Sequence, residues 1–139
     1  MPIVSRDFRA LRLDGVSRDL GQTHALRDVT LTVQRGEFVA LLGPSGCGKS
    51  TALNCIAGLL QPTSGEIWLD ERRIDEIGPE DRGFGMVFQN YALFPHMTVR
   101  RNIGFGLVTQ RRPKPEIAQR VEEALALVRL TEHGDKLPG

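Results

Sequence analysis

Gly43-Pro44-Ser45-Gly46-Cys47-Gly48-Lys49-Ser50-Thr51 decides the fold of this chain, because it fits the pattern of Gly, any four residues, Gly-Lys and Ser or Thr. The three glycines let the backbone curl so that successive N–H groups point at phosphate oxygens. The Lys49 ammonium can reach β- and γ-phosphate oxygens, and the Ser50 hydroxyl suits a Mg²⁺ ion. The loop therefore predicts a binding site for a nucleoside triphosphate with Mg²⁺.

The residues on either side of the loop support this interpretation. Residues 38–42 are a short continuous apolar run, which is typical of a strand buried on both faces of a parallel sheet. After the loop, Ala52, Ile56 and Leu60 recur at helical spacing. The phosphates would lie at the N-terminus of that helix, where free N–H groups and the helix dipole favour anions. The segment predicts an α/β fold.

Other segments carry weaker or stronger periodicity. Residues 29–33 and 66–70 alternate between apolar and polar types, which predicts two half-buried strands, and residues 86–88 are a third candidate strand. From Pro115 onward the apolar residues keep helical spacing, and proline suits a first helical turn. Residues 98–107 predict a helix less strongly, since two glycines there each cost about 1 kcal/mol relative to alanine.

Composition limits the possible functions. The chain has 139 residues, 25% of them charged and 40% hydrophobic, as in an ordinary globular domain. Its formal net charge of +1 gives no field for DNA or RNA, so we expect no nucleic-acid partner. Apolar runs reach about five residues, against roughly twenty for a membrane-spanning helix, which predicts a cytosolic protein. His24, His96 and His133 are interpreted as ordinary surface or interface histidines, and no metal cluster is expected.

The sequence resembles the ATP-binding subunits of ABC transporters. The resemblance rests on residues 25–29 and 36–38, on the loop continuing through residues 56–59, and most specifically on residues 86–99. It implies a P-loop NTPase fold with an N-terminal antiparallel β region, an incomplete core sheet and the start of a helical subdomain. The implied domains are residues 1–95 and 96–139.

The resemblance also assigns roles to single residues. Lys49 and Gln89 would be catalytic, and ATP and Mg²⁺ would be the ligands. The amide carbonyl of Gln89 would reach the Mg²⁺ ion or the attacking water, so Ser50 and Gln89 would both serve the metal. Residues 91–97 would lie near the groove that receives a coupling helix of the membrane subunits.

The run 86–99, together with residues 79–82, is similar to importer ATPases for polyamines, ferric iron, sulfate, phosphonates or sugars. A second ATP-binding subunit and membrane permease subunits are the implied partners, with a periplasmic binding protein acting indirectly. The implied location is the cytoplasmic face of the cell membrane, where the subunit is peripheral. The transported substrate is not encoded in this chain.

Two features depart from the family pattern. Leu20 stands where the family usually has an aromatic residue that stacks on adenine. By analogy with base stacking, worth about 1 to 3 kcal/mol, its loss would weaken ATP binding by one to two decades. The sequence also reaches Gly139 without the signature motif, the Walker B aspartate with its glutamate, or the switch histidine. We therefore expect no ATP hydrolysis by this chain alone, marginal stability and exposed apolar surface.

Cys47 is a candidate reactive residue of the phosphate loop. A thiol beside a helix N-terminus and Lys49 is expected to be reactive, so alkylation of Cys47 is expected to block nucleotide binding.

One alternative function is a non-catalytic nucleotide-binding or interaction module. Another is a P-loop kinase, which would need an arginine-rich lid after the loop; the segment around Gln89 argues against it.

Overall fold

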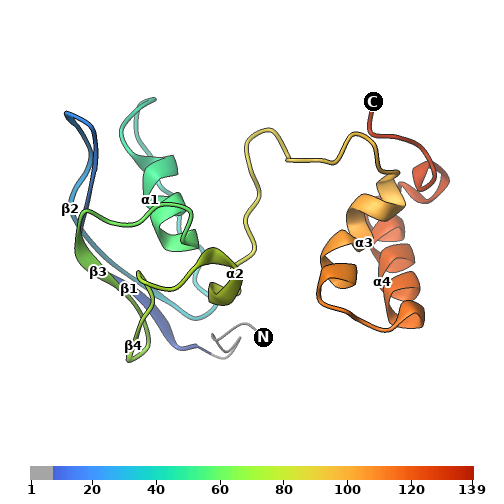
Figure 1. The fold of residues 1–139 in the computed structure, drawn as a ribbon, viewed down its shortest axis with the longest axis horizontal. Coiled ribbons are helices and arrows are strands. Elements are labelled where there is room, and N and C mark those ends of the chain that lie inside the picture. Colours follow the sequence, from blue (N-terminus) through green and yellow to red (C-terminus); the bar gives the residue numbers. More distant parts are fainter. Residues whose placement is uncertain (1–7) are drawn as a thin grey trace. The chain divides into compact units, whose positions relative to one another are not determined.

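The computed structural model describes residues 8–139, which form two compact units, one ending at Met86 and one spanning Val87–Gly139 (Figure 1). The first seven residues of the expected N-terminal domain lie outside the described part. Each unit has its own secondary structure and is described separately below.

The first unit contains a four-stranded antiparallel sheet in the order β2-β1-β3-β4. Its strands are β1 (Ala10–Leu20), β2 (Thr23–Gln34), β3 (Ser64–Leu69) and β4 (Arg72–Arg73). The predicted antiparallel β region is confirmed, and so are the predicted strands near residues 29–33 and 66–70. Irregular pairing along β1 shifts the register three times against β2.

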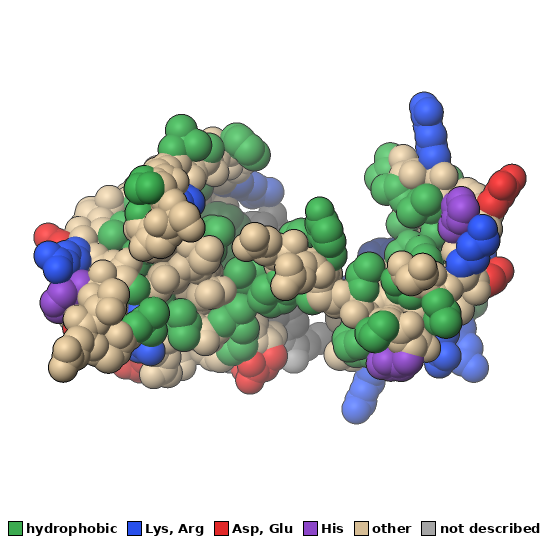
Figure 2. All heavy atoms as spheres, turned by 90° about the horizontal axis from the view of Figure 1, so that it is seen from above, with side chains coloured by type: hydrophobic (Ala, Val, Ile, Leu, Met, Phe, Trp, Pro, Cys, Tyr) green, Lys and Arg blue, Asp and Glu red, His purple; other side chains and the backbone are tan. Residues whose placement is uncertain are grey.

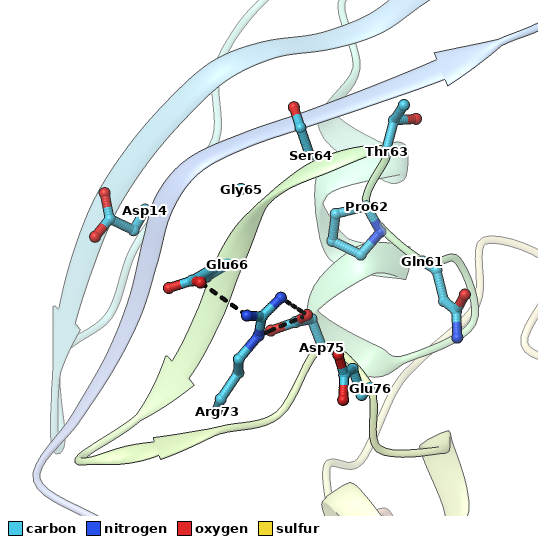
Figure 3. A pocket seen from close by; sticks show the side chains of 10 residues that line it. All are labelled: Asp14, Gln61, Pro62, Thr63, Ser64, Gly65, Glu66, Arg73, Asp75 and Glu76. Atoms are coloured by element: carbon cyan, nitrogen blue, oxygen red, sulfur yellow. Dashed lines mark hydrogen bonds and ion pairs between the residues drawn. The ribbon is translucent and has the colours of Figure 1, made fainter.

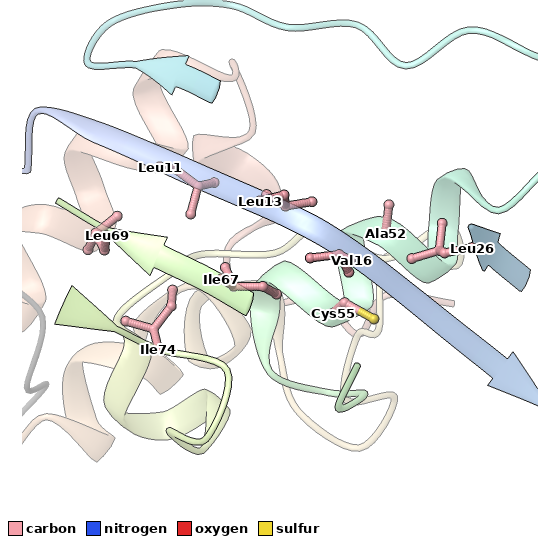
Figure 4. Close-up of a cluster of buried hydrophobic side chains, with 9 residues drawn as sticks. All are labelled: Leu11, Leu13, Val16, Leu26, Ala52, Cys55, Ile67, Leu69 and Ile74. Atoms are coloured by element: carbon pink, nitrogen blue, oxygen red, sulfur yellow. The ribbon is translucent and has the colours of Figure 1, made fainter. Parts of the chain in front are cut away.

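The core of the first unit lies between this sheet and helix α1 (Lys49–Ala57), which begins at the phosphate loop as the sequence predicts. Apolar side chains of β1 cluster with buried side chains of α1 (Figure 4). The cluster consists of Leu11, Leu13, Val16, Leu26, Ala52, Cys55, Ile67, Leu69 and Ile74. A short helix, α2 (Pro79–Arg82), follows β4.

Two predicted strands are wrong. Residues 38–42 pair with no strand in the described part of the chain, and the side chains of Phe38 and Leu42 are 94% and 92% exposed. Residues 86–88 are also unpaired, with Val87 84% exposed. A parallel strand needs hydrogen-bonding neighbours as well as apolar sequence, and residues 8–139 supply none beside these runs. The core sheet is thus incomplete, as expected, and apolar side chains gather on the surface (Figure 2).

The second unit contains a helical hairpin of α3 (Val99–Thr109) and α4 (Lys114–Leu127), followed by the 3₁₀ helix η1 (Thr131–His133). The Thr98 hydroxyl accepts a hydrogen bond from the Arg101 N–H at 3.3 Å and so caps α3. The weakly predicted helix therefore forms. Gly104 is buried, and a Cβ atom there would lie 3.3 Å from Cγ2 of Val121. The glycine that weakens helix propensity lets α3 approach α4.

Candidate functional site

The phosphate loop has the backbone geometry that its glycines predict. Gly46 and Gly48 have φ angles of 81° and 95°, in the left-handed region that disfavours other residues. A Cβ atom at Gly48 would overlap the carbonyl oxygen of Ala25 in strand β2. Only glycine therefore fits where the loop turns into α1 against the sheet.

Lys49 folds its side chain back over this loop. Its Nζ donates hydrogen bonds to the carbonyl oxygens of Gly43 at 2.8 Å and Pro44 at 2.7 Å, and it lies 3.3 Å from Sγ of Cys47. The ammonium is thus held beside the concave backbone by neutral acceptors and has no carboxylate partner within the described residues. An anion placed in the loop would meet a positive charge that is already oriented.

The N-terminus of α1 is open to an anion. Gly48 occupies the N-cap position and provides no side-chain cap, and the first helical turn carries no acidic residue. The first N–H groups of a helix have no partner within the helix, and the helix dipole adds partial positive charge there. Ser50 is exposed in this turn, next to Lys49. Gly43 to Thr51 therefore fit a phosphate chain, and the Ser50 hydroxyl fits a Mg²⁺ ligand.

Leu20 ends strand β1 at the tip of the β1–β2 hairpin and is 46% exposed. Figure 1 shows this tip at the same end of the first unit as the phosphate loop. The next pair along the hairpin is joined by a hydrogen bond of 2.6 Å between Nδ1 of His24 and Oδ1 of Asp19. Leu20 thus presents an aliphatic surface at the tip of the β1–β2 hairpin, and Ala25 on strand β2 of the same hairpin lies against Gly48.

Gln89 lies in an exposed turn of the second unit. The Tyr91 N–H donates to the Phe88 carbonyl at 2.9 Å, and Tyr91 and Ala92 have positive φ angles of 58° and 48°. Gln89 is exposed, so its side-chain amide is accessible to solvent. The phosphate loop belongs to the first unit and Gln89 to the second.

Asn102 is a site residue that sequence reasoning missed. Its Oδ1 accepts the Phe94 N–H at 2.9 Å, and its Nδ2 donates to the carbonyls of Phe94, Met97 and Thr98 at 3.0 to 3.1 Å. One side chain on α3 thus fixes the segment that follows Gln89. The signal was weak, since a single asparagine in a helix normally points at solvent.

A mostly apolar groove of about 490 Å³ runs between α3 and α4. Gly104 and Val121 form part of it, while Phe105 and Val108 are 40% and 60% exposed. Arg101 and Lys114 also line it and add positive charge. The groove is built entirely from residues of the second unit.

A second hollow, of about 650 Å³, lies in the first unit and is lined by none of the phosphate-loop residues (Figure 3). Its charged lining is mainly acidic: Asp14, Glu66, Asp75 and Glu76 against Arg73. Burial raises the pKa of Asp75, but hydrogen bonds from Arg73 and the Ile67 N–H outweigh it and hold the pKa below its usual range. Carboxylates repel phosphate, so this hollow does not suit a nucleotide.

No group of three or more metal-ligating side chains occurs among residues 8–139, and none of their helices has the length and apolar character to cross a bilayer. The glycine turns, the held lysine and the uncapped helix together define a P-loop nucleotide-binding protein.

Comparison with known proteins identifies the family. The sequence profile described as ABC transporter matches residues 26–138, and the chain belongs to this family. The expected α/β P-loop fold of the ABC ATPase type is confirmed by the same match and by solved structures. The ATP-binding cassette MJ0796 in a dimeric post-hydrolysis state bound to ADP and Pi matches with a TM-score of 0.79 and 32% identity, covering 92% of this chain and 61% of that one.

Curated relatives are more similar in sequence. The spermidine/putrescine import ATP-binding protein PotA of Oleidesulfovibrio alaskensis is 53% identical over 91% of this chain and 34% of its own length. The sulfate/thiosulfate import ATP-binding protein CysA of Gloeobacter violaceus is 49% identical over 93% and 38%. The sn-glycerol-3-phosphate import ATP-binding protein UgpC of Escherichia coli is 48% identical over 86% and 34%. The chain thus spans little more than a third of the length of these relatives.

Proposed function

We propose that this chain binds MgATP through Gly43 to Thr51 and forms part of the ATP-hydrolysing subunit of an ABC importer. The observation that carries the proposal is the position of the Lys49 ammonium, which is hydrogen-bonded to the carbonyl oxygens of Gly43 and Pro44 beside an uncapped helix N-terminus. ATP supplies the free energy for transport when it is hydrolysed. Lys49 would orient and neutralise the β- and γ-phosphates, Ser50 would hold Mg²⁺, and Gln89 would orient the attacking water or contact the metal.

Titration of the chain with a fluorescent ATP analogue and Mg²⁺ tests this proposal. Lys49→Ala removes a charge-assisted contact worth about 1.5–3 kcal/mol, so we expect affinity to fall about ten- to hundredfold. Lys136→Ala makes the same change at an exposed position of the second unit and is the matched control. Equal affinities of the two variants would contradict the proposed site.

Hydrolysis by this chain alone is not part of the proposal. Residues 90–139 contain no apolar strand followed by an aspartate-glutamate pair, and such a glutamate would polarise the attacking water. A coupled phosphate-release assay should therefore show no turnover above the Lys49→Ala background, even where nucleotide binds. Turnover that depends on Lys49 would overturn this expectation.

Cys47 provides a second measure of occupancy, with Cys55 as an internal control. Cys47 is exposed in the loop, whereas Cys55 is fully buried and burial raises its pKa. An alkylating agent should label Cys47 first, and MgATP should slow that labelling. Labelling of Cys47 at the same rate with and without MgATP would place the nucleotide elsewhere.

We infer the partners of the whole protein from the same family membership. The relatives are named as import ATP-binding proteins, which supports assembly with membrane permease subunits at the cytoplasmic side of the membrane. Dimeric ABC cassettes support a second ATP-binding subunit. A periplasmic binding protein would act indirectly, through the permease.

The groove between α3 and α4 is our proposed permease contact, together with residues 89–97. Its apolar lining suits the apolar face of a short helix, and Asn102 holds the neighbouring segment in place. Phe105→Asp in the full-length protein should abolish co-purification with the permease while leaving nucleotide affinity unchanged. Leu127→Asp, which changes an exposed apolar side chain outside the groove, is the control.

A further inference from the structure

Arg82 is the largest fully buried side chain in the described part of the molecule, and none of the proposed chemistry uses it. It ends the short helix α2 and is 1% exposed. Gly83 follows with a φ angle of 71°, so the chain turns sharply as it leaves Arg82. Residues 84–88 then lead directly to Gln89.

The guanidinium of Arg82 is bonded only to backbone carbonyl groups. Its Nη1 donates to Cys55 at 2.7 Å and Ile56 at 2.9 Å, Nη2 donates to Asp75 at 2.8 Å, and Nε donates to Ile77 at 2.7 Å. Among the described residues no carboxylate contacts it, because the Asp75 carboxylate pairs with Arg73 instead. Burial accordingly lowers the pKa of Arg82.

Cys55 and Ile56 belong to the last turn of α1. Carbonyl groups in a last turn lack partners within the helix and carry the negative end of its dipole. Arg82 therefore neutralises one end of the helix whose opposite end forms the phosphate site. Gly58 supports the same contact, since a Cβ atom there would lie only 2.7 Å from Nε of Arg82.

Packing alone does not require this arginine. A buried charge without a carboxylate partner is costly, and an apolar side chain of similar volume often stabilises such a site equally well. What an apolar side chain cannot do is bond four carbonyls from separate segments at once. Arg82 joins the end of α1 and the turn of residues 75–77 to helix α2, of which it is the last residue.

We propose that Arg82 is a positioning residue that ties the C-terminal end of α1 to the segment leading into Gln89. A change at the phosphate end of α1 is then transmitted along the helix to Gly83 and residues 84–89. This part of the inference rests on the proposed nucleotide site. The tie itself does not, because its hydrogen bonds involve no residue of the phosphate loop.

Hydrogen exchange of the wild-type chain and of Arg82→Lys, with and without MgATP, tests the proposal. Lysine keeps the charge and cannot span the four carbonyls. Without nucleotide, we expect amide exchange at residues 55–58 and 83–86 to become about tenfold faster in Arg82→Lys, given the loss of two or more hydrogen bonds. Exchange in β1 and β2 should stay within about twofold. Arg27→Lys, an exposed position on β2, is the matched control.

With MgATP, the wild-type chain should gain protection at residues 49–58 and at 83–89, and Arg82→Lys should gain it only at 49–54. Uniformly faster exchange throughout the first unit would mean that Arg82 only stabilises the fold, which would overturn the proposal. Unchanged exchange at 83–86 without nucleotide would overturn it as well. Absence of any MgATP effect in the wild-type chain would instead reject the nucleotide site, and the nucleotide-free comparison would still decide the role of Arg82.

Discussion

Strand β1 has five apolar residues among its eleven and residues 38–42 are apolar throughout, yet it is β1 that is buried. In β1, Leu13 and Val16 are almost completely buried between two neighbouring strands and α1. In residues 38–42, Phe38 and Leu42 are almost completely exposed, and no strand lies beside them in the described part of the chain. Apolar sequence alone therefore does not make a buried strand. A buried strand also needs neighbouring strands that satisfy its backbone hydrogen bonds.

The largest effect is expected from truncating a leucine in each region. Leu13→Ala leaves a cavity in the core and should lower the free energy of unfolding by about 2–5 kcal/mol. Leu42→Ala removes side-chain atoms that are already in water and should change it by less than about 0.5 kcal/mol. Urea unfolding followed by circular dichroism measures both. Equal losses would show that residues 38–42 are buried in solution, and the contrast between the two regions would disappear.

A smaller effect on the free energy of unfolding is expected from Asp75, which follows strand β4. Asp75 accepts hydrogen bonds from Arg73 and the Ile67 N–H, and its pKa is lowered in the folded state. It therefore stabilises the fold at neutral pH, and this contribution is lost as the pH falls through the folded-state pKa. Asp75→Asn should cost about 1–3 kcal/mol at pH 7 and make the stability less dependent on pH below about 4.

The control for Asp75 is Asp14→Asn, since Asp14 is an exposed carboxylate that lines the same hollow (Figure 3). We expect little change in stability at pH 7 from this substitution. An unfolding profile of Asp75→Asn that keeps the wild-type slope between pH 5 and pH 2 would show that other carboxylates govern acid unfolding.

At the open end of the hairpin, Leu20 should respond to the addition of an aromatic ring. Leu20→Trp restores the residue type that the family usually has there, and stacking on a base contributes about 1–3 kcal/mol. We expect ATP affinity to rise by about ten- to hundredfold, and discrimination of ATP over inorganic triphosphate to rise with it. Equal tightening for both ligands would place the base away from Leu20.

Local pattern predicted the elements whose partners lie nearby in the sequence. The loop at 43–51, helix α1, the strand at 29–33 and helix α4 depend on glycine placement and local periodicity. The antiparallel pairing of the N-terminal region was expected only from the family resemblance. The strands expected at 38–42 and 86–88 were wrong because a parallel strand depends on distant neighbours, which periodicity cannot register.

The polar contacts that hold the candidate site together could not be predicted in this way. Arg82 and Asn102 act through backbone carbonyls of other segments, and which carbonyls meet a side chain is fixed only by the fold. The phosphate loop is the opposite case, because the hydrogen bonds of its Lys49 side chain lie within nine consecutive residues. A site formed by one continuous segment can be predicted from the sequence, whereas a site formed by several distant segments is seen only in the structure.

The smallest expected effect on stability distinguishes two glycines of α3, one buried and one with free space around it. Gly104 is buried against Val121, while a Cβ atom at Gly106 would meet nothing within 4 Å. Gly106→Ala should therefore stabilise the chain by about 0.5–1 kcal/mol through helix propensity. At Gly104 the same gain is opposed by a contact of 3.3 Å with Cγ2 of Val121, so the net change should be near zero or unfavourable. If Gly104→Ala gained as much stability as Gly106→Ala, α3 and α4 would be free to separate, and their close approach would not be a fixed feature of the groove.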